Sequence, residues 1–182
     1  ARGRSDTNEL PMHRADDSHL IYSKGAATMY ALKYHLGERA INQALSKLVA
    51  NHSFPDRPAT TLDLIAYLSE DKSVEQLALI DDWFNHTDIH DFTVSKGQVR
   101  QSVEGYLLDL CVTEDKNRLK PVYVELADAQ GNTIDGFELK PDGEDTSQMC
   151  IAYQLKDRPT SIELDPDLLL LDSQRENNVY AL

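Results

Sequence analysis

The spacing of hydrophobic positions changes near residue 90 of this 182-residue chain. Before that point, apolar residues recur every three or four positions, which is typical of amphipathic helices. Beyond it, they alternate with polar residues or form short runs between turns, which is typical of strands. The pattern therefore predicts two regions, a helical part over residues 1–90 and a β part over residues 91–182.

Four helices joined by short loops are expected in the first region. They are predicted over 22–36, 38–51, 62–70 and from 73 to about 84. Gly37 ends the first, Thr60 or Thr61 caps the third, and Ser73 with Gln76 forms a capping box for the fourth. Side chains of helical spacing should form the buried stripes: Ala26, Met29, Tyr30, Lys33 and Leu36; Ile41, Leu45, Leu48 and Val49; Val74, Leu77, Ile80 and Phe84.

Six strand-like runs follow in the second region. They cover 91–96, 104–114, 121–128, 133–140, 147–156 and 160–165, with turns expected at Gly97, Gly105, Gly131–Asn132, Asp142–Gly143 and 157–159. Six or seven short antiparallel strands within about 90 residues predict a β-sandwich of immunoglobulin or fibronectin type. Because no low-complexity linker separates the regions, we expect an α+β protein whose helical segment packs against the sandwich.

Composition narrows the function classes. The formal net charge of −13 argues against nucleic acid as a partner and against binding to anionic lipid. No apolar run approaches the roughly 18 residues that a membrane-spanning helix needs. The first residues are basic but have no apolar stretch behind them, so they are not a secretory signal.

Cys111 and Cys150 are the two cysteines, and both fall in strand-like runs. Two thiols do not make a disulfide framework, so buried free thiols are the first expectation and a single disulfide is the alternative. The cellular compartment stays open.

Two histidines, His86 and His90, are spaced four residues apart, as on one face of a helix. A zincin motif needs a glutamate directly after the first histidine, and Thr87 occupies that place. The pair also straddles the expected end of the helical region. We therefore expect helix capping or solvent exposure for these side chains, not metal binding.

A set of short motifs follows in order from residue 22. It comprises Y-S-K-G (Tyr22, Lys24 and Gly25), L-G-E over 36–38, I-N-x-A-L over 41–45, and a threonine followed by D-L at 63–64. This ordered set resembles a segment of the aminopeptidase N-like zinc peptidases, the gluzincin group. The residues near the C-terminus, Asp165, Pro166, Asp172 and Asn178, are similar to the β-domain ending of bacterial members, with Asn177 where an aspartate is commoner.

The resemblance implies a role for Tyr22. In this family, zinc activates a water that attacks the peptide carbonyl, and a tyrosine hydroxyl stabilises the oxyanion that forms. Tyr22 matches that tyrosine. Gly25 would let the start of the helix approach another backbone closely, and Lys24 would meet nearby carboxylates or carbonyls.

The zinc motif H-E-x-x-H and the substrate-binding G-x-M-E-N loop of the family do not occur in this sequence. We therefore expect a fragment of a zinc aminopeptidase that is inactive alone and holds no metal in this chain, with zinc and peptide substrate bound in the parent protein. Its partner would be the missing upstream zinc domain, and the uncovered face could self-associate. Bacterial members include proteins fused to membrane transporter segments, so the localisation stays open.

Two other functions remain open at this point. The β-sandwich could be a module that binds a partner protein, with the helices serving as a connection. The chain could also be a catalytically inactive structural domain of a peptidase-like protein.

Overall fold

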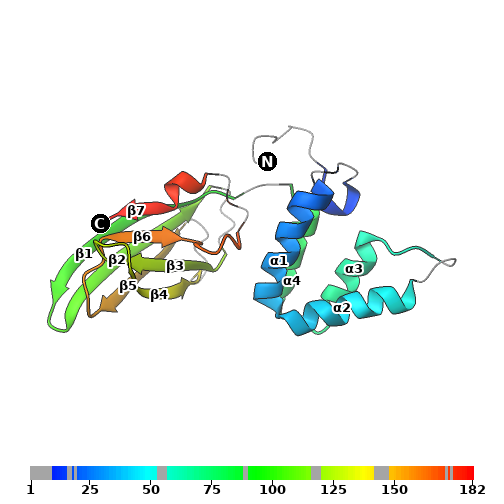
Figure 1. Ribbon diagram of the computed structural model, residues 1–182, viewed down its shortest axis with the longest axis horizontal. Helices are drawn as coiled ribbons and strands as arrows, with labels where there is room; N and C mark the ends of the chain where they lie inside the picture. Colours follow the sequence, from blue (N-terminus) through cyan, green and yellow to red (C-terminus); the bar gives the residue numbers. More distant parts are fainter. Residues whose placement is uncertain are drawn as a thin grey trace. The chain divides into compact units, whose positions relative to one another are not determined.

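The computed structural model describes residues 10–15, 18, 20–52, 57–87, 90–115, 120–141, 148–170, 172 and 174–182. It divides into two compact units, a helical unit (Ala1–Asp88) and a sandwich unit (Ile89–Leu182). The first carries helices and the second antiparallel strands (Figure 1), so the protein is α+β. Within the described ranges, no helix is both long enough and apolar enough to cross a membrane.

Within its described ranges, the helical unit has four α-helices, as the sequence predicts. They are α1 (Gly25–Leu36), α2 (Glu38–Asn51), α3 (Thr61–Leu68) and α4 (Val74–Asn85), preceded by the 3-10 turn η1 (Met12–Arg14) and the π-helix η2 (Leu20–Lys24). The hydroxyl of Ser73 accepts the N–H of Gln76, whose side chain in turn accepts the N–H of Ser73. The predicted capping box is therefore confirmed, and Thr60, not Thr61, caps α3.

The first predicted helix, 22–36, is a π-helix followed by an α-helix. Helical backbone begins at Leu20, slightly before the predicted start, because η2 runs directly into α1 at Gly25. Lys24, which precedes α1, has helical backbone angles (φ −68°, ψ −43°) and makes no side-chain cap. A helix that continues from another has few free N–H groups at its start, so it needs no cap. Gly37 (φ 85°) ends α1, as predicted.

The helical unit has its own hydrophobic core. Its buried members are Ala31, Leu32, Ile41, Ala44, Leu68, Ile80, Trp83 and Phe84. Part of the predicted stripes is therefore confirmed, but Tyr30, Val49 and Val74 are 59%, 72% and 78% exposed.

In α1 the buried side is formed by Thr28, Ala31 and Leu32 instead of the predicted row through Met29 and Tyr30. This helix is apolar on several sides, so spacing alone does not select the face that packs.

In the described residues of the sandwich unit there are seven strands. They are β1 (Phe92–Ser102), β2 (Gly105–Glu114), β3 (Val122–Ala127), β4 (Thr133–Leu139), β5 (Gln148–Leu155), β6 (Ser161–Leu164) and β7 (Val179–Ala181), with the 3-10 turn η3 (Arg175–Asn177) before β7. One sheet has the order β1-β2-β5 and the other β4-β3-β6-β7, with antiparallel pairing throughout. Strands 1, 2 and 5 facing strands 3, 4, 6 and 7 give a β-sandwich, as the sequence predicts.

One predicted turn is wrong. Gly97 does not end β1 but lies in its middle, opposite Leu110 of β2. A Cβ atom at this position would lie 2.8 Å from Cε1 of Tyr180 and 3.2 Å from Cδ1 of Ile162. The glycine therefore makes room for a close contact with a ring from the other sheet, which is a known use of glycine within a strand. The expected turn at Asp142–Gly143 lies outside the described residues.

The first expectation for the cysteines is also wrong. Cys111 of β2 and Cys150 of β5 are register partners, and they form a disulfide with a Cα–Cα distance of 4.1 Å. Only the pairing of strands separated by 39 positions brings the two thiols together, so their sequence neighbourhoods carry no sign of the bond.

Candidate functional site

Tyr22 lies in the π-helix η2, one turn before the start of α1. Its side chain is among the most exposed large side chains of the helical unit, at 76%. A π-helix is a rare, widened turn that often occurs at functional sites. Within the part of the chain that the structure describes, no residue bonds the Tyr22 hydroxyl, so this group can donate to an external acceptor.

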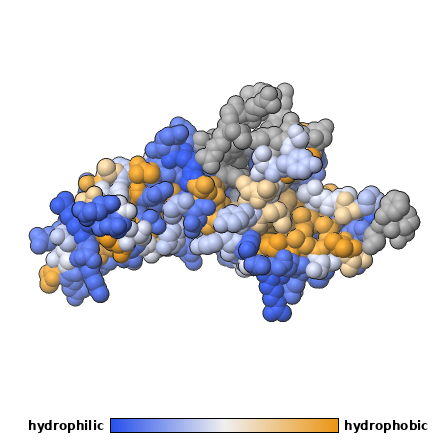
Figure 2. Space-filling model, viewed as in Figure 1, coloured by the Kyte–Doolittle hydropathy of each residue, from blue (hydrophilic) through white to orange (hydrophobic). Residues whose placement is uncertain are grey.

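Tyr22 continues a row of exposed side chains along α1. Residues 22, 26, 30 and 34 are spaced four apart, so they follow one side of the helix. Tyr30 and Tyr34 are 59% and 55% exposed, and Ala26, between Tyr22 and Tyr30, is exposed as well. We call these four residues the α1 tyrosine row. Hydrophobic side chains also lie at the surface of the helical unit in Figure 2.

Lys24 and Gly25 follow Tyr22 at the junction of η2 and α1. Both are half-buried. Gly25 has a helical backbone that other residues can also adopt, so its backbone angles do not require glycine. Their expected contacts with other carboxylates, carbonyls or backbone segments stay predictions.

Other residues of the ordered motif set have local structural roles. Gly37 has a positive φ of 85° in the turn between α1 and α2, where glycine is favoured. Thr60 and Asp63 form the capping box of α3, with Thr60 N donating to Asp63 Oδ2 at 2.9 Å. These residues therefore have local roles in turns and caps, whereas Tyr22 is exposed and has no such role.

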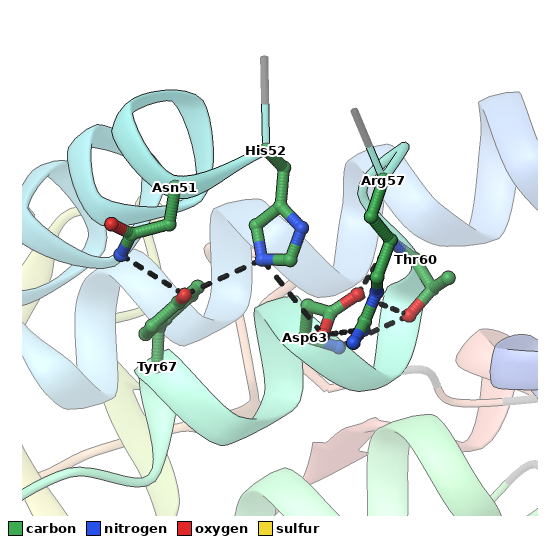
Figure 3. Close-up of polar contacts among 6 residues, drawn as sticks. All are labelled: Asn51, His52, Arg57, Thr60, Asp63 and Tyr67. Atoms are coloured by element: carbon green, nitrogen blue, oxygen red, sulfur yellow. Dashed lines mark hydrogen bonds and ion pairs between the residues drawn. The ribbon is translucent and has the colours of Figure 1, made fainter. Parts of the chain in front are cut away.

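Asp63 is the centre of a polar cluster between the end of α2 and the start of α3 (Figure 3). The Thr60 hydroxyl donates to its Oδ2 at 2.6 Å, and the Arg57 guanidinium forms an ion pair with its Oδ1. His52 Nε2 lies 3.9 Å from Oδ1. The hydrogen bonds from Thr60 and Arg57 lower the pKa of Asp63 to about 2. This carboxylate is therefore ionised near neutral pH and is committed to capping, so it is a poor general acid or base.

Tyr67 extends the cluster toward α2. Its hydroxyl accepts a hydrogen bond from Asn51 Nδ2 at 3.1 Å and lies 3.4 Å from His52 Nε2. The His52 side chain is 8% exposed, and its buried Nδ1 has no hydrogen-bond partner among the residues that the structure describes. The cluster links two helices across a loop, which accounts for its polar contacts. Sequence reasoning missed His52 and Tyr67, because neither belongs to a recognisable motif.

The C-terminal residues that resemble the family ending are mostly buried in the sandwich unit. Asp165 accepts the N–H groups of Leu169 and Leu170 at 2.8 and 2.9 Å. Asp172 accepts the N–H of Phe92 at 3.0 Å, across a sequence distance of 80 residues. These carboxylates fasten the C-terminal loop onto itself and onto β1. Hydrogen bonds to backbone N–H groups, and not a catalytic role, therefore account for the spacing of these motif residues.

Burial raises the pKa of Asp165 to about 6, against the lowering effect of its two backbone hydrogen bonds. Burial likewise raises the pKa of Asp172. With its amide nitrogen turned toward Asp172, Asn178 donates a hydrogen bond to Asp172 Oδ2 at 3.2 Å. The motif is thus a buried carboxylate pair whose ionised forms are costly in the fold.

A second buried polar group lies at the start of the sandwich. Lys120 Nζ is 2.7 Å from His90 Nε2, and His90 Nδ1 is 2.7 Å from Glu114 Oε1. Lysine can only donate, so Nε2 accepts and the imidazole proton lies on Nδ1, directed at Glu114. All three residues are at most 8% exposed. These contacts place the buried Lys120 and the buried Glu114 on opposite sides of His90, so their charges offset each other. None of the three residues lines either of the two hollows described below.

The two spaced histidines do not act together. His86 follows α4 as its C-cap residue and lies exposed, 3.2 Å from Asp81 Oδ2, as expected. His90 is 2% exposed and belongs to the sandwich unit, so the expectation of capping or solvent exposure is wrong for it. Among the described residues, no group of three or more His, Cys, Asp or Glu side chains could hold a metal ion.

Among the surface hollows on the described part of the chain, two differ in size and lining. The larger, of about 960 Å³, lies along α2 and is lined by charged and polar side chains, with the Lys47–Glu70 ion pair among them. Small-molecule sites are mostly apolar with a few polar groups, which this hollow does not match. The smaller, of about 250 Å³, lies over the Cys111–Cys150 disulfide.

A scan against protein-family models finds no match for this chain, and neither does a search of curated proteins. The family resemblance therefore rests on the ordered motif residues, and the roles based on it are proposals.

Proposed function

We propose that this chain contributes to a zinc-dependent aminopeptidase of the aminopeptidase N-like class, with Tyr22 as the oxyanion donor. The observation that carries the proposal is the Tyr22 hydroxyl, which is exposed on a π-helix at the start of the motif set. Zinc supplies an activated water in this class. The described residues include no ligand set for it, so it would be held by another part of the parent protein.

Tyr22 would act on the substrate carbonyl. As the carbonyl oxygen gains negative charge during attack, a phenolic O–H pointed at it donates a hydrogen bond that strengthens in the transition state. Such a group raises turnover more than it raises substrate affinity. An exposed hydroxyl that is not bonded within the described chain suits this task, because no internal hydrogen bond has to break first.

The α1 tyrosine row supports the same proposal. Tyrosine is enriched at protein interfaces, because its ring packs on apolar surface while its hydroxyl stays polar. In the parent protein, this row would line the substrate chamber or contact the zinc domain. On the isolated chain, it would be available for self-association.

The test uses the complete polypeptide that the gene encodes and an aminoacyl p-nitroanilide as substrate. Tyr22→Phe removes one hydroxyl and should lower kcat by roughly 100- to 1000-fold with little change in KM. Tyr30→Phe is the matched control on the same exposed row and should retain activity. Unchanged turnover in Tyr22→Phe, or an equal loss in both variants, would remove Tyr22 from the mechanism.

The alternative function is a non-catalytic interaction module formed by the sandwich. It predicts a complete polypeptide without stoichiometric zinc or peptidase activity, and a partner that is retained by residues 89–182. Metal analysis of the complete polypeptide separates the two proposals, since only the aminopeptidase requires bound zinc.

A further inference from the structure

The disulfide lies on the outer face of the three-stranded sheet. Residues next to Cys111 and Cys150 in their strands, Leu110, Val112 and Met149, are at most 1% exposed and point into the core. Because side chains alternate along a strand, both cysteines point away from the core. Cys150 is exposed and Cys111 is half-buried. The disulfide therefore faces the surface, and Cys150 is the more exposed of its two residues.

A β-bulge brings a lysine to this bond. β1 pairs Val94 with Val112, but the next registered pair is Lys96 with Cys111, so Ser95 is the extra residue. Without the extra residue, Ser95 would stand opposite Cys111 and Lys96 would fall on the core face. The Ser95 hydroxyl donates to the Cys111 carbonyl at 3.2 Å, which holds the bulge in place. Re-aiming one side chain is a common role of bulges.

The hollow of about 250 Å³ brings these groups together. Lys96, Cys111 and Cys150 all line it, and so does Asp109. Arg100 Nε lies 3.3 Å from Asp109 Oδ2, so the charge of this carboxylate is offset by its own partner. Lys96 is thus the cationic residue of this hollow that is in register with Cys111.

We propose that the Cys111–Cys150 disulfide is a thiol–disulfide exchange site at which Cys150 accepts a small thiol and Cys111 departs as a thiolate beside Lys96. A thiolate is the better leaving group when a cation stands next to it, and the exposed sulfur is the easier one to attack. Cys150 is the more exposed residue, and Cys111 is the one in register with Lys96. Both features favour attack on Cys150 and departure of Cys111.

The exchange has two balanced steps. A thiolate RS⁻ attacks Sγ of Cys150, the S–S bond breaks, and its electron pair stays on Sγ of Cys111. A second thiolate then attacks the R sulfur of the mixed disulfide, which gives RSSR and releases the Cys150 thiolate. Two external thiols are thus oxidised to one disulfide, and their two protons become available to Cys111 and Cys150.

The sandwich should stay folded through both steps. β2 and β5 are paired in register from Tyr106–Leu155 to Thr113–Gln148, and their inward side chains belong to the buried core. The mixed disulfide on Cys150 is accommodated on an exposed face, so the adduct requires no core side chain to move.

The experiment uses the full chain with an excess of reduced glutathione in native buffer. Samples are quenched with N-ethylmaleimide at early times and analysed by peptide mass spectrometry. We expect glutathione on Cys150 and alkylation on Cys111, with a first-step rate that falls roughly three- to tenfold in Lys96→Gln. Lys156→Gln, an exposed lysine that does not line the hollow, is the matched control and should react like the wild type.

Three outcomes would overturn the proposal. The first is glutathione on Cys111 or equally on both cysteines. The second is a Lys96→Gln rate equal to that of the wild type. The third is an exchange rate that follows the unfolded fraction when urea is added, because the bond would then react only in the unfolded chain. Circular dichroism of the reduced protein completes the test by showing whether the strands persist.

Discussion

Two carboxylates illustrate how burial and hydrogen bonding set opposite pKa shifts in this protein. Asp63 lies in a polar cap where Thr60 and Arg57 donate to it, and its pKa falls to about 2. Asp165 also accepts two hydrogen bonds, but burial outweighs them and raises its pKa to about 6. Stability from Asp63 is lost as pH falls from about 4 to 2. The burial of Asp165 has the reverse effect and lowers stability as pH rises from about 4 to 6.

Asp165→Asn tests the second of these effects. The variant should be less stable than the wild type at pH 4, because an amide has one acceptor for the N–H groups of Leu169 and Leu170. The difference in stability between the two proteins should be smaller at pH 7, because only the wild type ionises the buried Asp165 carboxyl between pH 4 and pH 7. Asparagine tolerates the positive φ of 51° at this position, so the backbone is not the cause of the difference.

The measurement for Asp165→Asn is the free energy of unfolding in urea at both pH values. Asp167→Asn, on the exposed part of the same loop, is the control and should change stability little at either pH. A gap that stays constant from pH 4 to pH 7 would contradict the raised pKa.

Single residues were predictable from sequence where their partners are local. Ser73 with Gln76 forms its predicted cap, because a capping box is complete within four residues. The disulfide and the contact of His90 with Glu114 were not predictable, because strand register brings these groups together over 39 and 24 positions. Tyr22 is an intermediate case, since a motif suggests its role but only the fold gives its exposure.

At the scale of elements, the sequence predicts the existence and order of helices and strands better than their faces. The four helices and six strand runs appear where the patterns place them, within a few residues except for the extension of β1. The buried side of α1 differs, because Thr28 packs inward while Tyr30 faces solvent. A face is chosen by what packs on it, and a helix with apolar residues on several sides leaves that choice to its neighbours.

Gly97→Ala tests the unexpected extension of β1. The added Cβ atom would meet the Tyr180 ring at 2.8 Å, so the ring or the strand must move. We expect the sandwich to lose about 1–3 kcal/mol of stability, which is typical of overpacking. In a Tyr180→Ala background, the same substitution should cost less, because the obstructing ring is gone.

The double-mutant cycle of Gly97 and Tyr180 is measured by urea unfolding of the full chain, followed by the β-sheet signal in circular dichroism. A coupling energy clearly different from zero supports direct contact between the two positions. Additive effects would mean that Gly97 is needed for another reason, such as the flexibility of β1. The test bears on where β1 ends, because the predicted turn at Gly97 would have made this strand about half as long.

At the scale of the whole molecule, the two units differ in what stabilises them. The core of the helical unit contains eight buried residues within the described chain, and that of the sandwich contains fourteen. The sandwich also carries the Cys111–Cys150 disulfide, which closes a loop between residues 39 positions apart. In the chain-entropy description, such a link contributes at most about 4 kcal/mol. The helical unit should therefore be the less stable one.

The single tryptophan makes this difference measurable. Trp83 is 3% exposed in the core of the helical unit, so its fluorescence reports on that unit. On heating, we expect the Trp83 signal to change at a lower temperature than the β-sheet signal in circular dichroism, because each unit has its own core and should unfold as its own cooperative step. Reducing the disulfide should bring the two midpoints closer by lowering only the second. Coincident midpoints before reduction would instead show that the units unfold as one.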